Sequence, residues 1–279
     1  MNLDEIITSA IAEDEGDGDH TTKSTIPPSA EGQAKLIIKA AGILCGMKVA
    51  EKVFFHVDRE LVMSPFLNDG AKVKKGDVAF QVSGKVSSIL LAERLVLNFM
   101  QRMSGIATAT SRLVRLTAGF HAKILDTRKT TPLLRELEKY AVRTGGGMNH
   151  RMGLYDMIMI KDNHVDYAGG IAKAIDEVQR YLKENSKSLK VEIEVRNFTE
   201  LQQVIDHGQV DRVMLDNFSV QDLKKALGMI AGSIETEASG GIDENNIRDY
   251  ASTGVDFISV GALTHHIQSL DMSLKAVRK

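Results

Sequence analysis

The sequence predicts an α/β protein in two parts: a C-terminal barrel-like α/β domain with an open sheet of about six parallel strands, and a smaller N-terminal α+β domain. Three observations lead to this prediction. After residue 120, short apolar runs that end in charge alternate with amphipathic helical segments. Four of these run ends recur at intervals of about 22 residues, which fits one βα unit per step. Before residue 87, short β-rich runs alternate with turn residues, as in small antiparallel domains.

The composition is that of an ordinary globular chain. Its 279 residues are 43% hydrophobic and 26% charged, and the net charge of −2 gives no overall positive field for nucleic acid or an anionic membrane. The single cysteine, Cys45, excludes an internal disulfide and a cysteine zinc cage, and we expect it to be a small buried residue. No apolar stretch approaches a membrane span, and the acidic first twenty residues do not resemble a signal peptide. We therefore expect a cytoplasmic protein.

The N-terminal domain is expected at residues 1–107. Apolar residues at helical spacing predict a first helix at residues 3–12. The acidic segment 13–20 lacks the spacing and the closing glutamate of a calcium loop, so we interpret it as a solvated loop. Within the β-rich region, residues 68–77 resemble the hairpin of a biotinyl or lipoyl carrier, but the residues that flank the modified lysine of such carriers are missing.

A long helix at residues 89–116 is expected to connect the two domains, with a break near residues 104–107. Arg94 and Arg102 lie on this helix, and spacing alone favours a solvated face for both. The α/β domain is expected at residues 108–279, with a last helix that packs back on the N-terminal domain. Its strands are predicted at residues 122–126, 156–162, 191–195, 212–216, 235–240 and 256–261.

Candidate chemistry lies where these strands end, because loops at the carboxyl edge of a parallel sheet carry the functional groups. The ends, in chain order, are residues 126–131, residues 161–164, Glu194, residues 216–217, residues 239–242 and residues 261–264. The first two ends are basic, the next two are acidic, and the last two are small and glycine-rich. This order of charges predicts an anionic ligand with more than one recognition point.

Each kind of strand end has a functional and a structural interpretation. Glycine turns that lead into helices bind phosphate through backbone N–H groups, although tight turns alone would also explain the glycines. Glu194 and Asp216 suit ribose hydroxyls and Mg²⁺, although they could instead form salt bridges with the nearby lysines. The combination favours a sugar phosphate beside a second anion that the basic cluster binds.

The motifs at these positions resemble those of the quinolinate phosphoribosyltransferase family. They are DTRKTTP at 126–132, GGG-x-NHR-x-GLYD at 145–156, IKDNH at 160–164, LDN at 215–217, ASGGI at 238–242 and SVGALTH at 259–265. Further matches at residues 13–21 and 92–108 extend the resemblance over nearly the whole chain. The resemblance implies phosphoribosyl transfer from phosphoribosyl pyrophosphate to quinolinate with decarboxylation, giving nicotinate mononucleotide, pyrophosphate and CO₂ in de novo NAD biosynthesis.

The resemblance also implies a role for each candidate residue. Arg94, Arg128, His150, Arg151 and Lys161 would hold quinolinate, Lys129 would also reach the donor, Glu194 and Asp216 would bind the ribose and Mg²⁺, and Ser239, Gly240, Gly241 and Gly261 would take the 5′-phosphate. Lys129, Lys161, Glu194 and Asp216 would be the catalytic set, with Mg²⁺ held directly or through the donor. Arg94 would come from the partner subunit of a homodimer with shared active sites, which could assemble further.

Other interpretations stay open at this point. A related phosphoribosyltransferase-like protein of molybdenum-transport operons shares the fold and much of the motif set. Lys161 at a strand end could form a Schiff base as in class I aldolases, although Asp162 and the surrounding cations favour an anion clamp. The hairpin at residues 68–77 would instead make the chain a carrier or binding protein.

Overall fold

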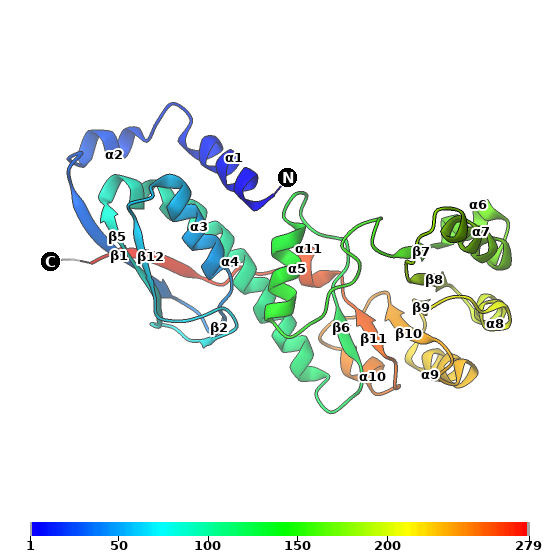
Figure 1. Ribbon diagram of the computed structural model, residues 1–279. Coiled ribbons are helices and arrows are strands. Elements are labelled where there is room, and N and C mark those ends of the chain that lie inside the picture. Colours follow the sequence, from blue (N-terminus) through cyan, green and yellow to red (C-terminus); the bar gives the residue numbers. More distant parts are fainter. Residues whose placement is uncertain (1, 278–279) are drawn as a thin grey trace. The chain divides into compact units, whose positions relative to one another are not determined.

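The structure of the protein, a computed structural model, describes residues 2–277 (Figure 1). It contains two compact units, each assembled from segments that are distant in the sequence. The first unit comprises Met1–Ser111, Thr131–Gly146 and His266–Lys279, and the second unit comprises Arg112–Thr130 and Gly147–His265.

The first unit contains a four-stranded antiparallel sheet in the order β12-β1-β5-β3. Its strands are β1 (Glu31–Ile38), β3 (Val62–Pro65), β5 (Val78–Lys85) and β12 (Met272–Ala276), and a second small sheet pairs β2 (Gly42–Ile43) with β4 (Lys72–Val73). Along β1 the buried residues alternate, with Ala34, Leu36 and Ile38 inside, because only one face of this antiparallel sheet packs on the core. The predicted small antiparallel module is confirmed.

Helices accompany this sheet in the first unit. They are α1 (Leu3–Glu15), α2 (His20–Thr25), α3 (Met47–Val57) and α5 (Arg135–Thr144), together with most of α4 (Val86–Leu116). A capping box starts α1, because Asn2 and Glu5 each accept the backbone N–H of the other. The predicted first helix is therefore confirmed, and it continues to Glu15. Asp19 caps α2 by accepting the N–H of Thr22, which shortens the solvated loop that we expected.

Two expectations about these elements are wrong. Helix α4 runs without a break from Val86 to Leu116. Gly105 lies in it for a different reason: a Cβ there would come 2.3 Å from the backbone oxygen of Gln268, so glycine permits a close approach of two backbone segments. The last segment is a strand, not a helix, and β12 pairs with β1 from Ala34 opposite Ala276 to Ile38 opposite Met272.

The second unit is built on a six-stranded parallel sheet in the order β6-β11-β10-β9-β8-β7 (Figure 1). Its strands are β6 (Lys123–Leu125), β7 (Ile158–Ile160), β8 (Val191–Val195), β9 (Arg212–Asp216), β10 (Glu235–Ser239) and β11 (Phe257–Ser259). Its helices are α6 (Asp162–Ala168), α7 (Ile171–Glu184), α8 (Phe198–His207), α9 (Val220–Ile230), α10 (Ile247–Ala251) and α11 (Ala262–His265). The sheet ends at β6 and β7 and is open, as the sequence predicts.

Strand pairing determines which side chains of this sheet share a face. Successive side chains of a strand point to opposite faces, so Glu192 and Glu194 of β8 share the face opposite its three apolar residues. The parallel register places Glu194 beside Met214 and places Asp216 beside Ser239. One face of the sheet is therefore polar near the carboxyl ends of its strands.

Candidate active site

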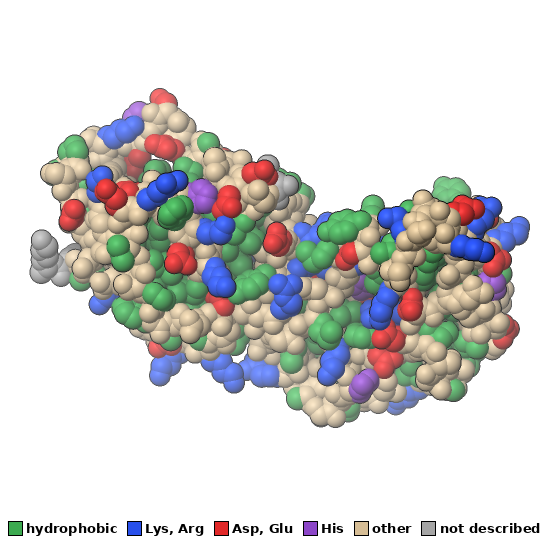
Figure 2. Space-filling view, viewed as in Figure 1, with side chains coloured by type: hydrophobic (Ala, Val, Ile, Leu, Met, Phe, Trp, Pro, Cys, Tyr) green, Lys and Arg blue, Asp and Glu red, His purple; other side chains and the backbone are tan. Residues whose placement is uncertain are grey.

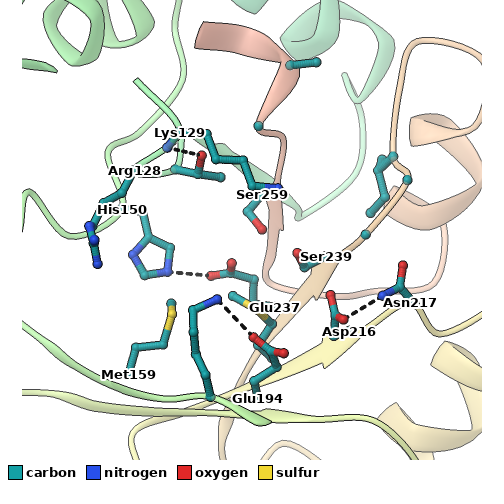
Figure 3. Close-up of a pocket in the computed structure, with 18 of the residues that line it drawn as sticks. Arg128, Lys129, His150, Met159, Glu194, Asp216, Asn217, Glu237, Ser239 and Ser259 are labelled. Atoms are coloured by element: carbon teal, nitrogen blue, oxygen red, sulfur yellow. Dashed lines mark hydrogen bonds and ion pairs between the residues drawn. The ribbon is translucent and has the colours of Figure 1, made fainter. Parts of the chain in front are cut away.

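A cavity of about 870 Å³ lies at the carboxyl ends of these strands (Figure 3). It is lined by Arg128, Lys129, His150, Arg151, Lys161, Glu194, Asp216, Ser239, Gly240, Gly241 and Gly261. These are all of the predicted site residues except Arg94, which lies on α4 in the first unit. The structure thus brings together residues that are separated by more than a hundred positions in the sequence.

The basic loop after β6 is fixed by hydrogen bonds on both sides of Lys129. The N–H of Lys129 donates to Oγ1 of Thr127 at 3.0 Å, and its carbonyl accepts from Oγ1 of Thr264 at 2.8 Å. Asp126, which is fully buried, accepts the N–H of His150 at 2.9 Å. The loop that carries Lys129 and the segment that carries His150 are therefore connected through one carboxylate.

His150 is buried, and both of its ring nitrogens have close neighbours. Nδ1 accepts the N–H of Arg151 at 2.7 Å, so Nε2 carries the ring proton. Nε2 lies 2.9 Å from Oε2 of Glu192 and 3.4 Å from Oε2 of Glu237. Burial alone would lower the pKa of His150, but the contacts with these two carboxylates outweigh it and raise that pKa to about 9. While Nδ1 accepts the N–H of Arg151, the ring carries one proton, on Nε2, and this N–H faces the carboxylates; a second proton, on Nδ1, would break the hydrogen bond to Arg151.

Cations crowd the same part of the cavity. Burial lowers the pKa of Arg151, and the positive charge of Arg128 lowers it further. Figure 2 shows Lys and Arg side chains interspersed with Asp and Glu over one face of the molecule. An anionic ligand would relieve this repulsion.

Carboxylates from the neighbouring strands face the cavity as well. Nζ of Lys161 lies 3.3 Å from Oε2 of Glu194. Burial raises the pKa of Glu194, the charge of Lys161 opposes that shift, and the charge of Asp216 adds to it. Asp216 also accepts from Nδ2 of Asn217 at 2.6 Å. Because Mg²⁺ prefers carboxylate oxygens, and because Glu194 and Asp216 repel each other across the cavity wall, this pair fits a divalent cation.

The turn after β10 adopts a conformation that favours glycine. Gly240 has φ of +96° and Gly241 has φ of +62°. A Cβ on Gly240 would lie 2.2 Å from Oδ1 of Asn217, whereas a Cβ on Gly241 would meet no atom within 4 Å. At the end of β11, a Cβ on Gly261 would lie 3.0 Å from Cδ of Lys129. Turns of this kind present backbone N–H groups that can bind phosphate.

Several residues that line the cavity were given no role of their own in the sequence analysis. They include Thr127, Met159, Met214, Asn217, Glu237, Ser259 and His265. For Glu237 a signal was present: β8 reads VEIEV and β10 reads ETEAS, and glutamates two residues apart share one face of a strand. A strand buried on both faces is normally apolar, so glutamates inside it indicate a polar cavity.

Among the described residues, every helix is too short or too polar to cross a bilayer.

Comparisons with known proteins find relatives along nearly the whole chain. Residues 19–104 match the family profile described as "Quinolinate phosphoribosyl transferase, N-terminal domain", and residues 106–275 match that of the C-terminal domain. The chain is 46% identical to "Quinolinate phosphoribosyltransferase [decarboxylating] 1b" of Nicotiana tabacum, over 98% of this chain and 82% of the relative. It is 44% identical, with the same coverage, to the chloroplastic "Nicotinate-nucleotide pyrophosphorylase [carboxylating]" of Arabidopsis thaliana.

Solved structures show the same similarity. The nicotinate-nucleotide pyrophosphorylase from Francisella tularensis matches with a TM-score of 0.92 and 43% identity, over 99% of this chain and 96% of that chain. NadC from Streptococcus pyogenes matches with a TM-score of 0.93 and 38% identity, over 98% of this chain and 95% of that chain. The similarity covers both units.

Proposed function

The chain belongs to the quinolinate phosphoribosyltransferase family, and we infer that it transfers a phosphoribosyl group from phosphoribosyl pyrophosphate to quinolinate with decarboxylation. The products are nicotinate mononucleotide, pyrophosphate and CO₂, which makes the protein a pentosyltransferase of NAD biosynthesis, a nicotinate-nucleotide diphosphorylase (carboxylating). One observation carries the inference: a single cavity combines a cluster of cations, two carboxylates and glycine turns. These are the groups that a dicarboxylate, a ribose and a phosphate require.

Quinolinate would bind at the cationic part of the cavity. Its two carboxylates need partners with several N–H donors, and an arginine fork can bind a carboxylate through two hydrogen bonds. Arg128, His150, Arg151 and Lys161 supply such donors, and we call these four residues the quinolinate clamp. Lys129 lies on the same loop as Arg128 and would reach the phosphoribosyl donor.

The donor would bind at the remaining strand ends. Ser239, Gly240, Gly241 and Gly261 would receive the 5′-phosphate through backbone N–H groups. Glu194 and Asp216 would bind the ribose hydroxyls and would hold Mg²⁺, directly or through the donor. Bound Mg²⁺ would neutralise negative charge on the pyrophosphate group.

The reaction needs no covalent bond to the enzyme. The ring nitrogen of quinolinate attacks the anomeric carbon while the bond to pyrophosphate breaks. The carboxylates of Glu194 and Asp216 stabilise the positive charge that develops on the anomeric carbon. The bond between C2 and its carboxylate then breaks, the electron pair stays on C2, CO₂ leaves, and a proton from water takes its place. Positioning and electrostatics are therefore the main contributions of the protein.

Arg94 would complete the quinolinate clamp from a second subunit. It lies on α4 in the first unit, far in the sequence from every strand end that lines the cavity. In a two-fold homodimer each subunit would contribute Arg94 to the other's cavity, so both sites would depend on assembly. Higher oligomers of such dimers are compatible with this proposal.

The test is turnover of quinolinate by the purified chain. Incubation with quinolinate, phosphoribosyl pyrophosphate and Mg²⁺ should yield equal amounts of nicotinate mononucleotide and CO₂, and nicotinate in place of quinolinate should give little product. Absence of turnover would contradict the proposal. Nothing in the comparisons supports the molybdenum-transport alternative, and borohydride would trap Lys161 only if it formed a Schiff base.

A cytoplasmic location, expected from the sequence, remains part of the proposal. Several plant relatives carry the word mitochondrial or chloroplastic in their names. Cell fractionation with an antibody to this chain would test the location.

A further inference from the structure

A buried charged cluster contains His150 of the quinolinate clamp and three residues that have no role in the proposed function. It consists of His150, Glu192, Glu237 and Arg212. Glu192 and Glu237 are both 0% exposed. Nη1 of Arg212 donates to Oε2 of Glu237 at 3.1 Å, and this is the same oxygen that faces His150. Figure 3 shows Glu237 reaching from its strand toward the ring of His150.

The two carboxylates are unfavourable for stability. Oε1 of Glu192 and Oε1 of Glu237 have no hydrogen-bond partner among the described residues, and Oε2 of Glu192 has only its contact with Nε2 of His150. Removing a carboxylate from water is costly, and a whole buried ion pair can often be replaced by uncharged residues of similar volume without loss of stability. Two carboxylates here face one permanently charged cation, Arg212. Their presence therefore indicates a function other than stability.

Metal binding is not that function. His150, Glu192 and Glu237 are the kinds of residue that hold a metal ion, and their ligand atoms lie within 4.8 Å of one another. However, Nε2 of His150 and Oε2 of Glu192 are only 2.9 Å apart, which is a hydrogen-bond separation. Two atoms bound to one tetrahedral metal at about 2.1 Å would lie roughly 3.4 Å apart. A proton on Nε2 and the guanidinium of Arg212 account for the contacts.

The ring of His150 connects the two carboxylates to the quinolinate clamp. Its Nε2 faces Glu192 and Glu237, and its Nδ1 accepts the backbone N–H of Arg151 at 2.7 Å. Rotation of the ring would break the contacts at both nitrogens together. The orientation of the ring therefore fixes the backbone N–H of Arg151. The side chain of Arg151 is repelled by the positive charge of Arg128.

We propose that Glu192 and Glu237 are positioning residues for quinolinate, acting through His150. They accept the hydrogen of Nε2 and so keep the ring and the Arg151 backbone in place while the cavity is empty. Their negative charge also stabilises the clamp cations, which repel one another. A clamp that is already ordered loses less entropy when the dianion binds, so affinity for quinolinate is higher. This inference rests on the proposed function, because it takes quinolinate as the ligand of the clamp.

The test uses substitutions that keep the shape and remove the charge, Glu192→Gln and Glu237→Gln. Glu235→Gln is the matched control: Glu235 lies on the same strand as Glu237 and also pairs with Arg212, at 3.2 Å, but its side chain is 41% exposed and does not line the cavity. For each protein we would measure kcat, KM for both substrates, the unfolding temperature and bound metal. Binding of phthalate, which has the same pair of carboxylates but no ring nitrogen, would be measured by calorimetry to separate affinity from chemistry.

We expect KM for quinolinate and Kd for phthalate to rise roughly tenfold or more in both Gln variants, because a positioned partner of a buried charge is lost. KM for phosphoribosyl pyrophosphate should stay within about twofold, and the unfolding temperature should stay near that of the wild type, because Arg212 keeps Glu235 as a partner in both variants. Glu235→Gln should behave as the wild type. This combination separates positioning from a purely structural role, which would lower the unfolding temperature and affect both substrates alike.

Four results would overturn the inference. An active wild type together with Gln variants that keep the wild-type KM for quinolinate would refute the inference alone. Unfolding at lower temperature with equal rises in both KM values would make the carboxylates structural. One equivalent of metal in the wild type that is lost in Glu192→Gln would make the cluster a metal site. A wild type without quinolinate turnover would contradict the proposed function itself, and the inference with it.

Discussion

Arg151 is the residue at which substrate binding is most directly separable from folding. Replacing it by alanine removes a guanidinium that faces the cavity and leaves its backbone contact with His150 in place. We expect transition-state stabilisation, calculated from kcat/KM for quinolinate, to fall by roughly 2 to 5 kcal/mol, as when one side of a desolvated charge pair is truncated. Steady-state kinetics would measure it. Arg196→Ala is the control, because Arg196 pairs with Asp166 and Glu200 and does not line the cavity; equal rates in both variants would remove Arg151 from the site.

A substitution at Gly240 should affect binding of the phosphoribosyl donor and not binding of quinolinate. Alanine at this position would place a Cβ 2.2 Å from Oδ1 of Asn217 and would hold a side chain at φ of +96°. The turn must shift, so KM for phosphoribosyl pyrophosphate should rise at least roughly tenfold, while KM for quinolinate changes little. Gly254→Ala has nearly the same φ, +93°, with no atom within 4 Å of its Cβ. If both variants show the same kinetics, backbone strain alone is responsible.

The residues of the site differ in how well their roles can be predicted from the sequence. The polar strand ends were predicted because a buried apolar run that stops at a charged residue marks the carboxyl edge of a parallel sheet. Glu192 and Glu237 lie inside such runs and look there like members of a strand pattern. The reason for Gly240 lies in Asn217, which follows a different strand. Sequence spacing gives the positions on one strand, but contacts between strands require the register of the sheet.

At the scale of elements, strand β12 depends on a segment that is distant in the sequence, strand β1. Leu274 is 5% exposed and lies opposite Leu36 of β1. Leu274→Asp would bury a carboxylate without a partner, so the free energy of unfolding should fall by roughly 2 to 5 kcal/mol. Urea unfolding followed by circular dichroism would measure it. Lys275→Asp, at the exposed neighbouring position, should have little effect; the same loss in both would mean that β12 does not contribute to the core.

The elements that were predicted incorrectly share a cause. The glycine in α4 has the sequence appearance of a helix break, but its backbone contact with Gln268 is the reason for the small residue. Residues 272–276 alternate apolar and other side chains, a strand pattern that is too short to decide without its partner β1. In both cases a distant segment determines the local structure. The parallel strands were predicted well because their pattern repeats and reinforces itself.

At the scale of the whole molecule, the proposed dimer can be tested by mixing two inactive variants. Arg94→Ala and Lys129→Ala would be combined under conditions that allow subunits to exchange. If the two residues meet across the interface, a mixed dimer has one site with both defects and one intact site. Activity should then recover to about a quarter of the wild type, since half of the dimers are mixed.

The control for this experiment is proof of exchange. Mass spectrometry of the intact complexes must show mixed dimers, and each variant alone must stay inactive after the same treatment. Mixed dimers without recovered activity would place Arg94 in its own subunit's site or outside the site altogether.

The pairing of β12 with β1 also has a consequence for the order of events during synthesis. Strand β1 leaves the ribosome early, but its partner along one edge is made only after the entire parallel sheet of the second unit. Domains usually fold in the order in which they are translated. In this chain the first part to emerge must wait with an open strand edge, and the second part can fold before it. Contacts between such distant positions also slow folding, because the loop between them must close first.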